Sequence, residues 1–169
     1  MRLRGDFGRA GTLAGVLAFV LALAACSGQV GQPKEYELGA AAAVTPGGVE
    51  DFAASAGDVV YFAGDSTALS PAAQATLRKQ VRWLNRHPGY RVTVEGHADE
   101  WGTRQHNLTL GAQRATAVET FLKQNGLRAG RIHTVSYGKE RPVADCTALS
   151  CRSQNRRAQT VLSAPTAAR

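Results

Sequence analysis

The sequence is poor in the residues on which most metal sites and hydrolases depend. It holds three cysteines among 169 residues, whereas a structural zinc site normally takes four ligands. Neither a G-x-S-x-G motif nor an Asp-x-x-His motif occurs anywhere in the chain, so the usual parts of a serine hydrolase are missing. We therefore expect no metal, no cofactor and no catalytic residue, and we interpret the chain as a non-enzyme.

Aromatic residues and long apolar runs are also scarce. The apolar run from Leu13 to Ala22 is shorter than the roughly 20 residues that a membrane-spanning helix needs. Basic residues outnumber acidic ones by 20 to 13, but aromatic residues make up 7% of the chain and do not alternate with the basic ones. Nucleic-acid binding is therefore not expected. The positive charge instead favours anionic cell-wall polymer or lipid headgroups.

The first 25 residues form a secretory signal, with a basic start, an apolar middle and a cleavage region that ends at Leu23-Ala24-Ala25-Cys26. This ending resembles the bacterial lipobox, which implies that Cys26 is the lipid anchor. The alternative is cleavage nearby, with Cys26 unmodified. Ser27, in place of aspartate, implies transfer to the outer membrane. Loss of three arginines and one aspartate with residues 1–25 lowers the formal charge from +7 to +5.

The other two cysteines, Cys146 and Cys151, remain as a pair in an oxidising compartment. Their C-x4-C spacing favours a disulfide across a short loop, and two free thiols are the alternative. Closure of so short a loop is expected to contribute about 2 kcal/mol. We interpret the pair as a local clip.

The chain has one segment long enough for a compact domain. Residues 26–57 are dominated by Gly, Ala, Ser and Pro and predict a lipid-anchored flexible tether. A helical turn over 38–44 is possible before Pro46 ends it. Residues 58–163 suffice for one domain, and residues 164–169 form a C-terminal tail.

Strand and helix signals alternate along residues 58–163. The first predicted helix carries an apolar stripe at Ala73, Leu77, Val81 and Leu84. The second carries Leu108, Ala112, Ala115, Val118 and Leu122. The predicted elements are a strand over 58–62, a helix between Ser70 and His87, a strand over 90–95, a helix between Thr103 and Asn125, a strand over 131–137, a loop over 138–150, a short helix over 151–156 and a strand over 157–163. This order, βαβαβ followed by αβ, predicts an α/β (α+β) two-layer sandwich with its helices on one mixed sheet.

Several separated motifs resemble one family. EGHADE-x-GT, NL-x-LG-x-x-RA, VSYGKE-x-P and NRRA follow one another within residues 58–163. They resemble the OmpA-like peptidoglycan-binding domain and, with the lipobox and tether, are similar to the peptidoglycan-associated lipoproteins (Pal) of the Tol-Pal envelope and cell-division system. The resemblance implies noncovalent binding of the diaminopimelate of the stem peptide, and a TolB-like periplasmic partner. The alternative is mainly a protein-docking module with weak wall binding.

The resemblance implies that Asp99 and Arg114 bind the diaminopimelate. Their chemistry suits this ligand, since Asp99 can accept hydrogen bonds from its ammonium and Arg114 can hold a carboxylate with a planar fork. An analogue without the ammonium would leave Asp99 unpaired, at a cost of a few kcal/mol if it is buried. Convergence requires the loop that precedes this helix to fold back over it, because Arg114 lies roughly 16 Å along the helix from the Thr103 cap.

The remaining pocket residues follow from the same resemblance: Phe62, Thr103, Asn107 and Leu110. Asn107 could equally bond the loop backbone, and Leu110 could belong to the core. Glu95 and His97 alternate with Asp99 along the predicted strand, which makes a metal or acid/base site conceivable and a structural role the favoured interpretation.

Three further features bear on the site. The NRR segment, residues 155–157, is expected to brace loops without touching ligand. Ala63 and Trp101 stand where the family often has aspartate and arginine, so one contact is lost and a flat apolar surface is gained at the rim. Gly64-Asp65-Ser66 resembles the start of certain esterases, which makes a hydrolase the rival class, although the chain lacks the residues that would complete it.

Overall fold

The structure is a computed structural model that describes residues 44–146 and 148–163. The predicted signal sequence, the Cys26 anchor, most of the tether and the C-terminal tail lie outside these ranges. Among the described residues, no helix has the length and apolar character to cross a membrane. The elements are α2 (Val49–Ala56), β1 (Val59–Tyr61), α3 (Pro71–Arg86), β2 (Arg91–His97), α4 (Arg104–Gln124), the 3-10 helix η1 (Ala129–Arg131), β3 (Ile132–Gly138), α5 (Leu149–Asn155) and β4 (Arg157–Ser163).

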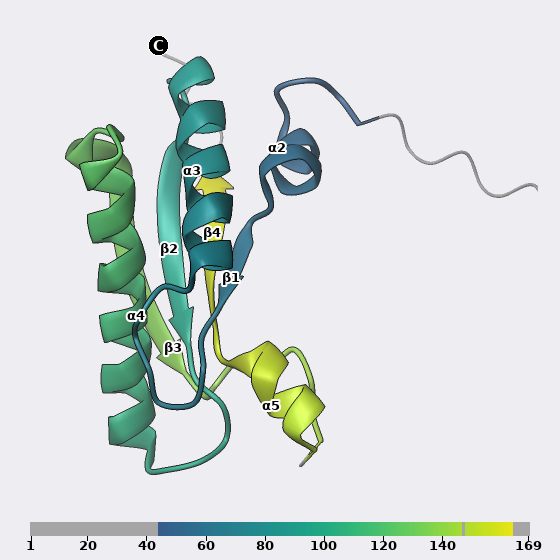
Figure 1. The fold of residues 1–169 in the computed structure, drawn as a ribbon, viewed down its shortest axis with the longest axis vertical. Helices are drawn as coiled ribbons and strands as arrows, with labels where there is room; N and C mark the ends of the chain where they lie inside the picture. Colours follow the sequence, from purple (N-terminus) through teal and green to yellow (C-terminus); the bar gives the residue numbers. More distant parts are fainter. Residues whose placement is uncertain (1–43, 147, 164–169) are drawn as a thin grey trace, which may run out of the picture. The chain divides into compact units, whose positions relative to one another are not determined.

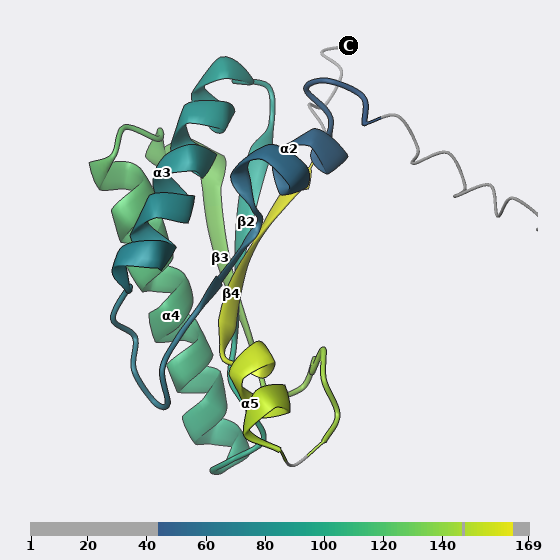
Figure 2. The same ribbon diagram turned by 45° about the vertical axis from the view of Figure 1, so that its right-hand side comes forward.

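The four strands form one mixed sheet in the order β1-β4-β2-β3 (Figure 1). β2 and β3 are parallel, with α4 as the crossover between them, whereas β4 runs antiparallel to both β1 and β2. Figures 1 and 2 show α3 and α4 side by side against one face of the sheet. The predicted α/β sandwich on a mixed sheet is confirmed.

The core lies between this helical layer and the sheet. Val92 and Val94 alternate with half-buried residues along β2, so only one face of the strand is fully covered. Leu77 and Leu84 of α3 meet this face and are completely buried. The α3 stripe is therefore the one the sequence predicts. Helix α3 also begins as predicted, because the Ser70 hydroxyl accepts a hydrogen bond from the Ala73 amide and proline occupies the first turn.

Helix α4 is rotated relative to the predicted stripe. Leu108 is half-buried and Ala112 is exposed, so these two expectations are wrong. The buried face of α4 consists of Asn107, Leu110, Gly111, Arg114, Ala115, Val118 and Leu122. The reason is a close backbone approach, because a Cβ at Gly96 of β2 would collide with the Gly111 carbonyl. Because Asn107, Gly111 and Arg114 are part of the buried face, a search for apolar residues alone does not predict which side of α4 is buried.

The folded part also begins earlier than predicted. Residues 49–56, which the sequence analysis included in the tether, form helix α2. Phe52 is 1% exposed and packs edge-on against Trp83 of α3, with ring centroids 5.1 Å apart. The Tyr90 hydroxyl donates to the Gly47 carbonyl at 2.9 Å, which fixes the turn before α2. A buried aromatic, together with the hydrogen bond from the Trp83 indole to Asp51, docks this helix, although its composition is otherwise that of a linker.

Candidate functional site

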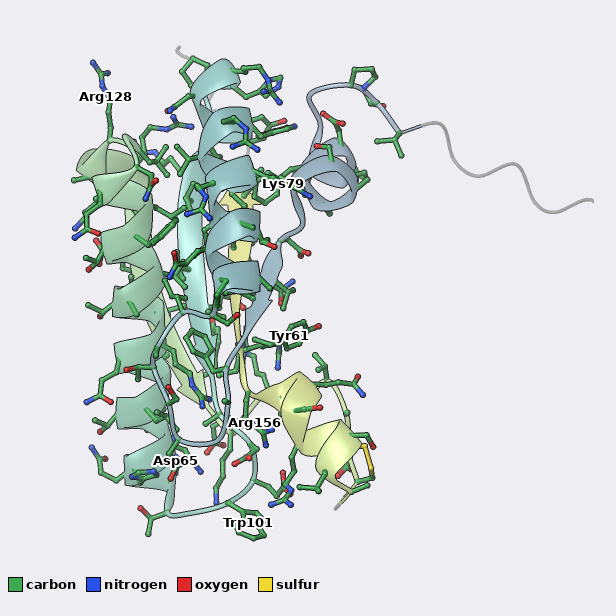
Figure 3. The ribbon with its side chains drawn as sticks, in the orientation of Figure 1. Tyr61, Asp65, Lys79, Trp101, Arg128 and Arg156 are labelled. Atoms are coloured by element: carbon green, nitrogen blue, oxygen red, sulfur yellow. A yellow bond between two sulfur atoms is a disulfide. The ribbon has the colours of Figure 1, made fainter. Side chains whose placement is uncertain are left out.

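Loops from three parts of the chain meet at one end of the sheet. The loops that follow β1 and β2, together with α5 and the first turn of α4, enclose a cleft of about 490 Å³. Figure 3 shows Asp65, Trp101 and Arg156 at this end of the domain. The cleft is lined mainly by charged and aromatic side chains, which include Asp65, Asp99, Trp101, His106, Arg152 and Arg156.

Asp99 lies in the loop directly after β2 and is 8% exposed. One carboxylate oxygen is 3.1 Å from Nη1 of Arg156, and the other accepts the Trp101 amide at 3.3 Å. The carboxylate is therefore held at the wall of the cleft by one cation and one backbone donor. It retains acceptor capacity, since an ionised carboxylate offers about four lone-pair sites.

Arg114 is fully buried beneath the loop that follows β1. Its Nε donates to the Ser66 carbonyl at 3.1 Å, Nη1 donates to the His97 carbonyl at 2.7 Å, and Nη2 donates to the Gly64 carbonyl. The guanidinium also lies over the Phe62 ring, 5.1 Å from its centroid. These bonds hold the loop after β1 over α4 and place Arg114 beside the end of β2. They do not involve the loop that precedes α4, which was expected to fold back over the helix.

Burial lowers the pKa of Arg114 to about 10, and the Asp99 carboxylate partly opposes this shift. Arg114 therefore stays charged at neutral pH. It lies within electrostatic reach of Asp99 but is not part of the cleft lining. Three of its five N–H groups have backbone partners, which leaves two unassigned.

The other predicted pocket residues support the site from below. Phe62 and Leu110 are buried, at 4% and 5% exposed. The Thr103 hydroxyl caps α4 by accepting the His106 amide at 3.1 Å. Nδ2 of Asn107 donates to the Trp101 carbonyl at 2.7 Å, whereas its Oδ1 is buried without a hydrogen-bond partner. Of the two roles predicted for Asn107, the backbone bond is observed.

Arg156 has a role that the sequence analysis missed. It was expected to brace loops away from any ligand. Its Nε does brace a loop, by donating to the Phe62 carbonyl at 3.3 Å, but its Nη1 pairs with Asp99 and the side chain lines the cleft. The NRR motif drew attention to Arg156 but did not predict where its side chain points. That direction depends on how α5 packs against the domain, and α5 is a short helix after an irregular loop, without a periodic apolar pattern.

Arg152 and Trp101 form the rim of the cleft. The Arg152 guanidinium lies over the indole at 4.2 Å, while Trp101 is 66% exposed. The Trp101 amide donates to the Asp99 carboxylate, and the Trp101 carbonyl accepts from the Asn107 side chain, so the backbone of Trp101 is held on both sides. The rim therefore presents an exposed aromatic surface with a cation stacked on it.

Glu95 and His97 lie on β2 and do not line the cleft. Strand β2 ends at His97, so Asp99 leaves the strand and does not continue the predicted alternation. His97 Nε2 is 3.7 Å from Glu95 Oε2. Burial, with help from the positive charges of Arg157 and Arg141, lowers the pKa of His97 to about 4. Within residues 44–146 and 148–163, no cluster of three potential metal ligands occurs.

The loop before α5 is fixed by a covalent and a polar contact. Cys146 and Cys151 are joined in a disulfide, with a Cα–Cα distance of 5.7 Å. Asn155 accepts the Val143 and Ala144 amides and donates to the Ala144 carbonyl. Both contacts bind the loop to α5, the helix that carries Arg152.

Comparisons with known proteins agree on the domain and its organisation. Residues 61–156 match the OmpA family. A "Peptidoglycan-associated lipoprotein" of Agrobacterium fabrum is 51% identical over 149 residues, 86% of this chain and 84% of the relative. One of Rhizobium meliloti is 50% identical over 149 residues, 86% of this chain and 84% of the relative. The crystal structure of the peptidoglycan-associated lipoprotein from Burkholderia pseudomallei superimposes with a TM-score of 0.61 at 38% identity, covering 63% of this chain and 90% of that one.

Proposed function

Because the chain belongs to the OmpA family and, within it, to the peptidoglycan-associated lipoproteins, we propose that its cleft binds peptidoglycan noncovalently through the diaminopimelate of the stem peptide. The observation that carries this proposal is the pair formed by Asp99 and Arg156 at the wall of the cleft. A carboxylate and a guanidinium side by side suit a ligand that bears both an ammonium and carboxylates. No covalent chemistry is required.

In the proposed complex, Asp99 accepts hydrogen bonds from the ligand ammonium and guanidinium groups receive its carboxylates. Arg152 and Arg156 line the cleft and are the guanidinium groups proposed for this role, although Arg152 lies 3.9 Å from Glu100 and Arg156 pairs with Asp99. The Asp99 carboxylate and the Arg156 guanidinium pair with each other in the free protein. When the ligand binds, its ammonium pairs with Asp99 and its carboxylate pairs with Arg156, so both side chains keep a partner of opposite charge. This exchange favours a zwitterionic ligand over an analogue with only one kind of charge.

Arg114 contributes through the loop after β1 in this proposal. Its bonds to Gly64 and Ser66 fix the loop that supplies Asp65 to the cleft. A direct contact between its two remaining N–H groups and a ligand carboxylate would require this loop to move, because Arg114 is completely buried beneath it. Phe62, Thr103, Asn107 and Leu110 shape the same floor, and the free Oδ1 of Asn107 offers one further acceptor.

The test is co-sedimentation with purified sacculi that contain diaminopimelate. We expect Asp99→Asn and Arg156→Gln each to weaken binding roughly tenfold to a hundredfold, because each removes a charge-assisted hydrogen bond of about 1.5–3 kcal/mol. Glu119→Gln is the matched control, since it removes a carboxylate that pairs with Lys123 on the surface of α4. Unchanged pelleting of both cleft variants would disprove the site.

We also propose that a lipid on Cys26 anchors the protein in the outer membrane, so that the domain links membrane and wall in the periplasm as part of the Tol-Pal system. The lipobox and the relatives named lipoproteins support this. Labelling with radioactive palmitate should disappear in Cys26→Ala, and retained label would refute the anchor.

A TolB-like periplasmic protein is the proposed second partner of this end of the domain. Trp101 and Leu149 line the cleft and are 66% and 71% exposed, and exposed aromatic anchors are typical of protein interfaces. Trp101→Ala should weaken the protein complex by more than it weakens binding to sacculi. Equal losses would show that Trp101 serves the wall ligand instead.

A further inference from the structure

Helix α3 carries positive charge and no negative charge. Its 16 residues contain no Asp or Glu, and its solvent-facing side bears Arg78, Lys79, Arg82 and Arg86, all exposed. Positions 78, 79, 82 and 86 fall within about 100° of one another around the helix. None of these four cations forms an ion pair with another described residue. They form an uncompensated cationic stripe.

Three of these cations surround a hollow between α3 and α2. The hollow has a volume of about 220 Å³ and is lined by Lys79, Arg82 and Arg86 together with Ser55, Ala56 and Trp83. Figure 3 shows Lys79 pointing from α3 toward α2. The hollow exists because α2 docks on α3 through Phe52, so it depends on the helix that the sequence analysis did not predict.

The two acids of α2, Glu50 and Asp51, form no ion pair with these cations. Asp51 already accepts the Trp83 indole N–H at 2.9 Å and the Gly47 amide at 3.0 Å through one oxygen. These bonds, more than the nearby cations, lower the pKa of Asp51. Its carboxylate is therefore committed to holding α2, and it makes no ion pair with Lys79, Arg82 or Arg86.

The chemistry of the hollow suits a phosphate-bearing surface. Stable protein interfaces have an apolar core, yet none of the large exposed apolar residues among those described lies on α3. Each Lys or Arg close to an anionic membrane contributes about 1 kcal/mol of attraction. A row of unpaired cations without an apolar centre therefore suits a membrane surface better than a protein interface. Helix α2, which lines this hollow, also begins at Val49, 23 residues after Cys26.

We propose that the hollow between α2 and α3 binds the headgroup phosphates of anionic phospholipids, with Lys79, Arg82 and Arg86 as ligands and Arg78 as a flanking cation. The contact would orient the domain on the membrane surface, with its cleft at the other end of the sheet free for the wall. This role extends the proposed membrane attachment but uses neither the lipid on Cys26 nor the cleft.

The test uses residues 41–169 without the lipid. This part holds the whole core, and the solved relative that it resembles consists almost entirely of the same domain. We expect it to co-sediment with vesicles of phosphatidylglycerol and phosphatidylcholine at about 30 mM salt, and to bind much less at about 500 mM, where charges are screened within a few ångströms. Vesicles of phosphatidylcholine alone should bind little.

Arg82→Gln should weaken vesicle binding roughly fivefold, and Lys79→Gln with Arg82→Gln roughly 25-fold, from about 1 kcal/mol per cation. The matched control is Arg104→Gln, which removes one exposed charge beside the cleft where Arg104 pairs with Glu140; it should change binding less than twofold. Thermal unfolding checks that each variant is folded.

Equal losses in Arg82→Gln and Arg104→Gln would overturn the proposal, because net charge alone would then explain the attraction. Absence of binding to the anionic vesicles would also overturn it and leave an acidic protein surface as the partner class. Binding to sacculi is measured separately, so failure here does not count against the cleft.

Discussion

The two ends of the sheet are held together by different means. At the cleft end, three loops have little apolar content, and polar side chains fix them by bonding to backbone carbonyls and amides. Arg114 binds three carbonyls and Asn155 binds two residues of the loop before α5. The opposite end is built from helix on helix, with Phe52, Trp83 and Tyr90 packed together.

Arg131 makes the comparison closer, because it is the counterpart of Arg114 at the helical end. It donates to the carbonyls of Leu84, His87 and Tyr90 at 3.1, 3.0 and 2.9 Å. Arg131 is half-buried, however, and water can replace it, whereas Arg114 is completely buried. Two arginines thus make the same kind of contact with three carbonyls. Arg131 covers the end of α3 at the surface, whereas Arg114 supports the binding site from inside the domain.

Replacement of each arginine by methionine measures this difference. We expect Arg114→Met to lower the free energy of unfolding by roughly 4 kcal/mol, because it removes three hydrogen bonds from a charged and completely buried guanidinium, each worth about 1.5–3 kcal/mol at most, and leaves the buried His97 carbonyl without a donor. Arg131→Met should cost about 1–2 kcal/mol, since the Arg131 side chain is half-buried and water can take its place. Urea unfolding at pH 7 gives both values. Similar losses at the two ends would contradict the distinction drawn between them.

The apolar end has its own most sensitive position in Phe52. Phe52→Ala should destabilise the domain by about 3 kcal/mol through loss of burial and formation of a cavity, while binding to sacculi is retained by the folded fraction. Val49→Ala on the same helix is the control, because Val49 is 43% exposed and should cost less than about 0.5 kcal/mol. If Phe52→Ala has no effect on urea unfolding, α2 is not part of the cooperative unit.

The same contrast explains which features could be predicted from the sequence. The strands, α3 and the order of the elements follow from periodicity and capping, which act over a few residues. The direction of Arg156 and the burial of Arg114 depend on contacts 57 and 48 residues away in sequence, and no local pattern encodes them. Helix α2 was not predicted because its one large buried side chain, Phe52, packs on Trp83, which lies 31 residues away in sequence.

The cleft end should also be the acid-sensitive one, through His97. Its ring is 1% exposed, and both ring nitrogens lack hydrogen-bond partners. The pKa of His97 is about 4 in the folded protein and 6.5 ordinarily, so on acidification the unfolded chain binds this proton first. The free energy of unfolding is therefore unaffected by His97 above pH 6.5 and falls by about 3 kcal/mol between pH 6.5 and 4. His97→Phe keeps a ring against Tyr137 and removes the titration, so its stability should fall less steeply over this window in urea unfolding at pH 7, 6, 5 and 4. Titration of carboxylates changes the free energy of unfolding of both proteins in the same way. If the free energies of the wild type and of His97→Phe fall in parallel with pH, His97 takes up its proton in the folded domain without a loss of stability.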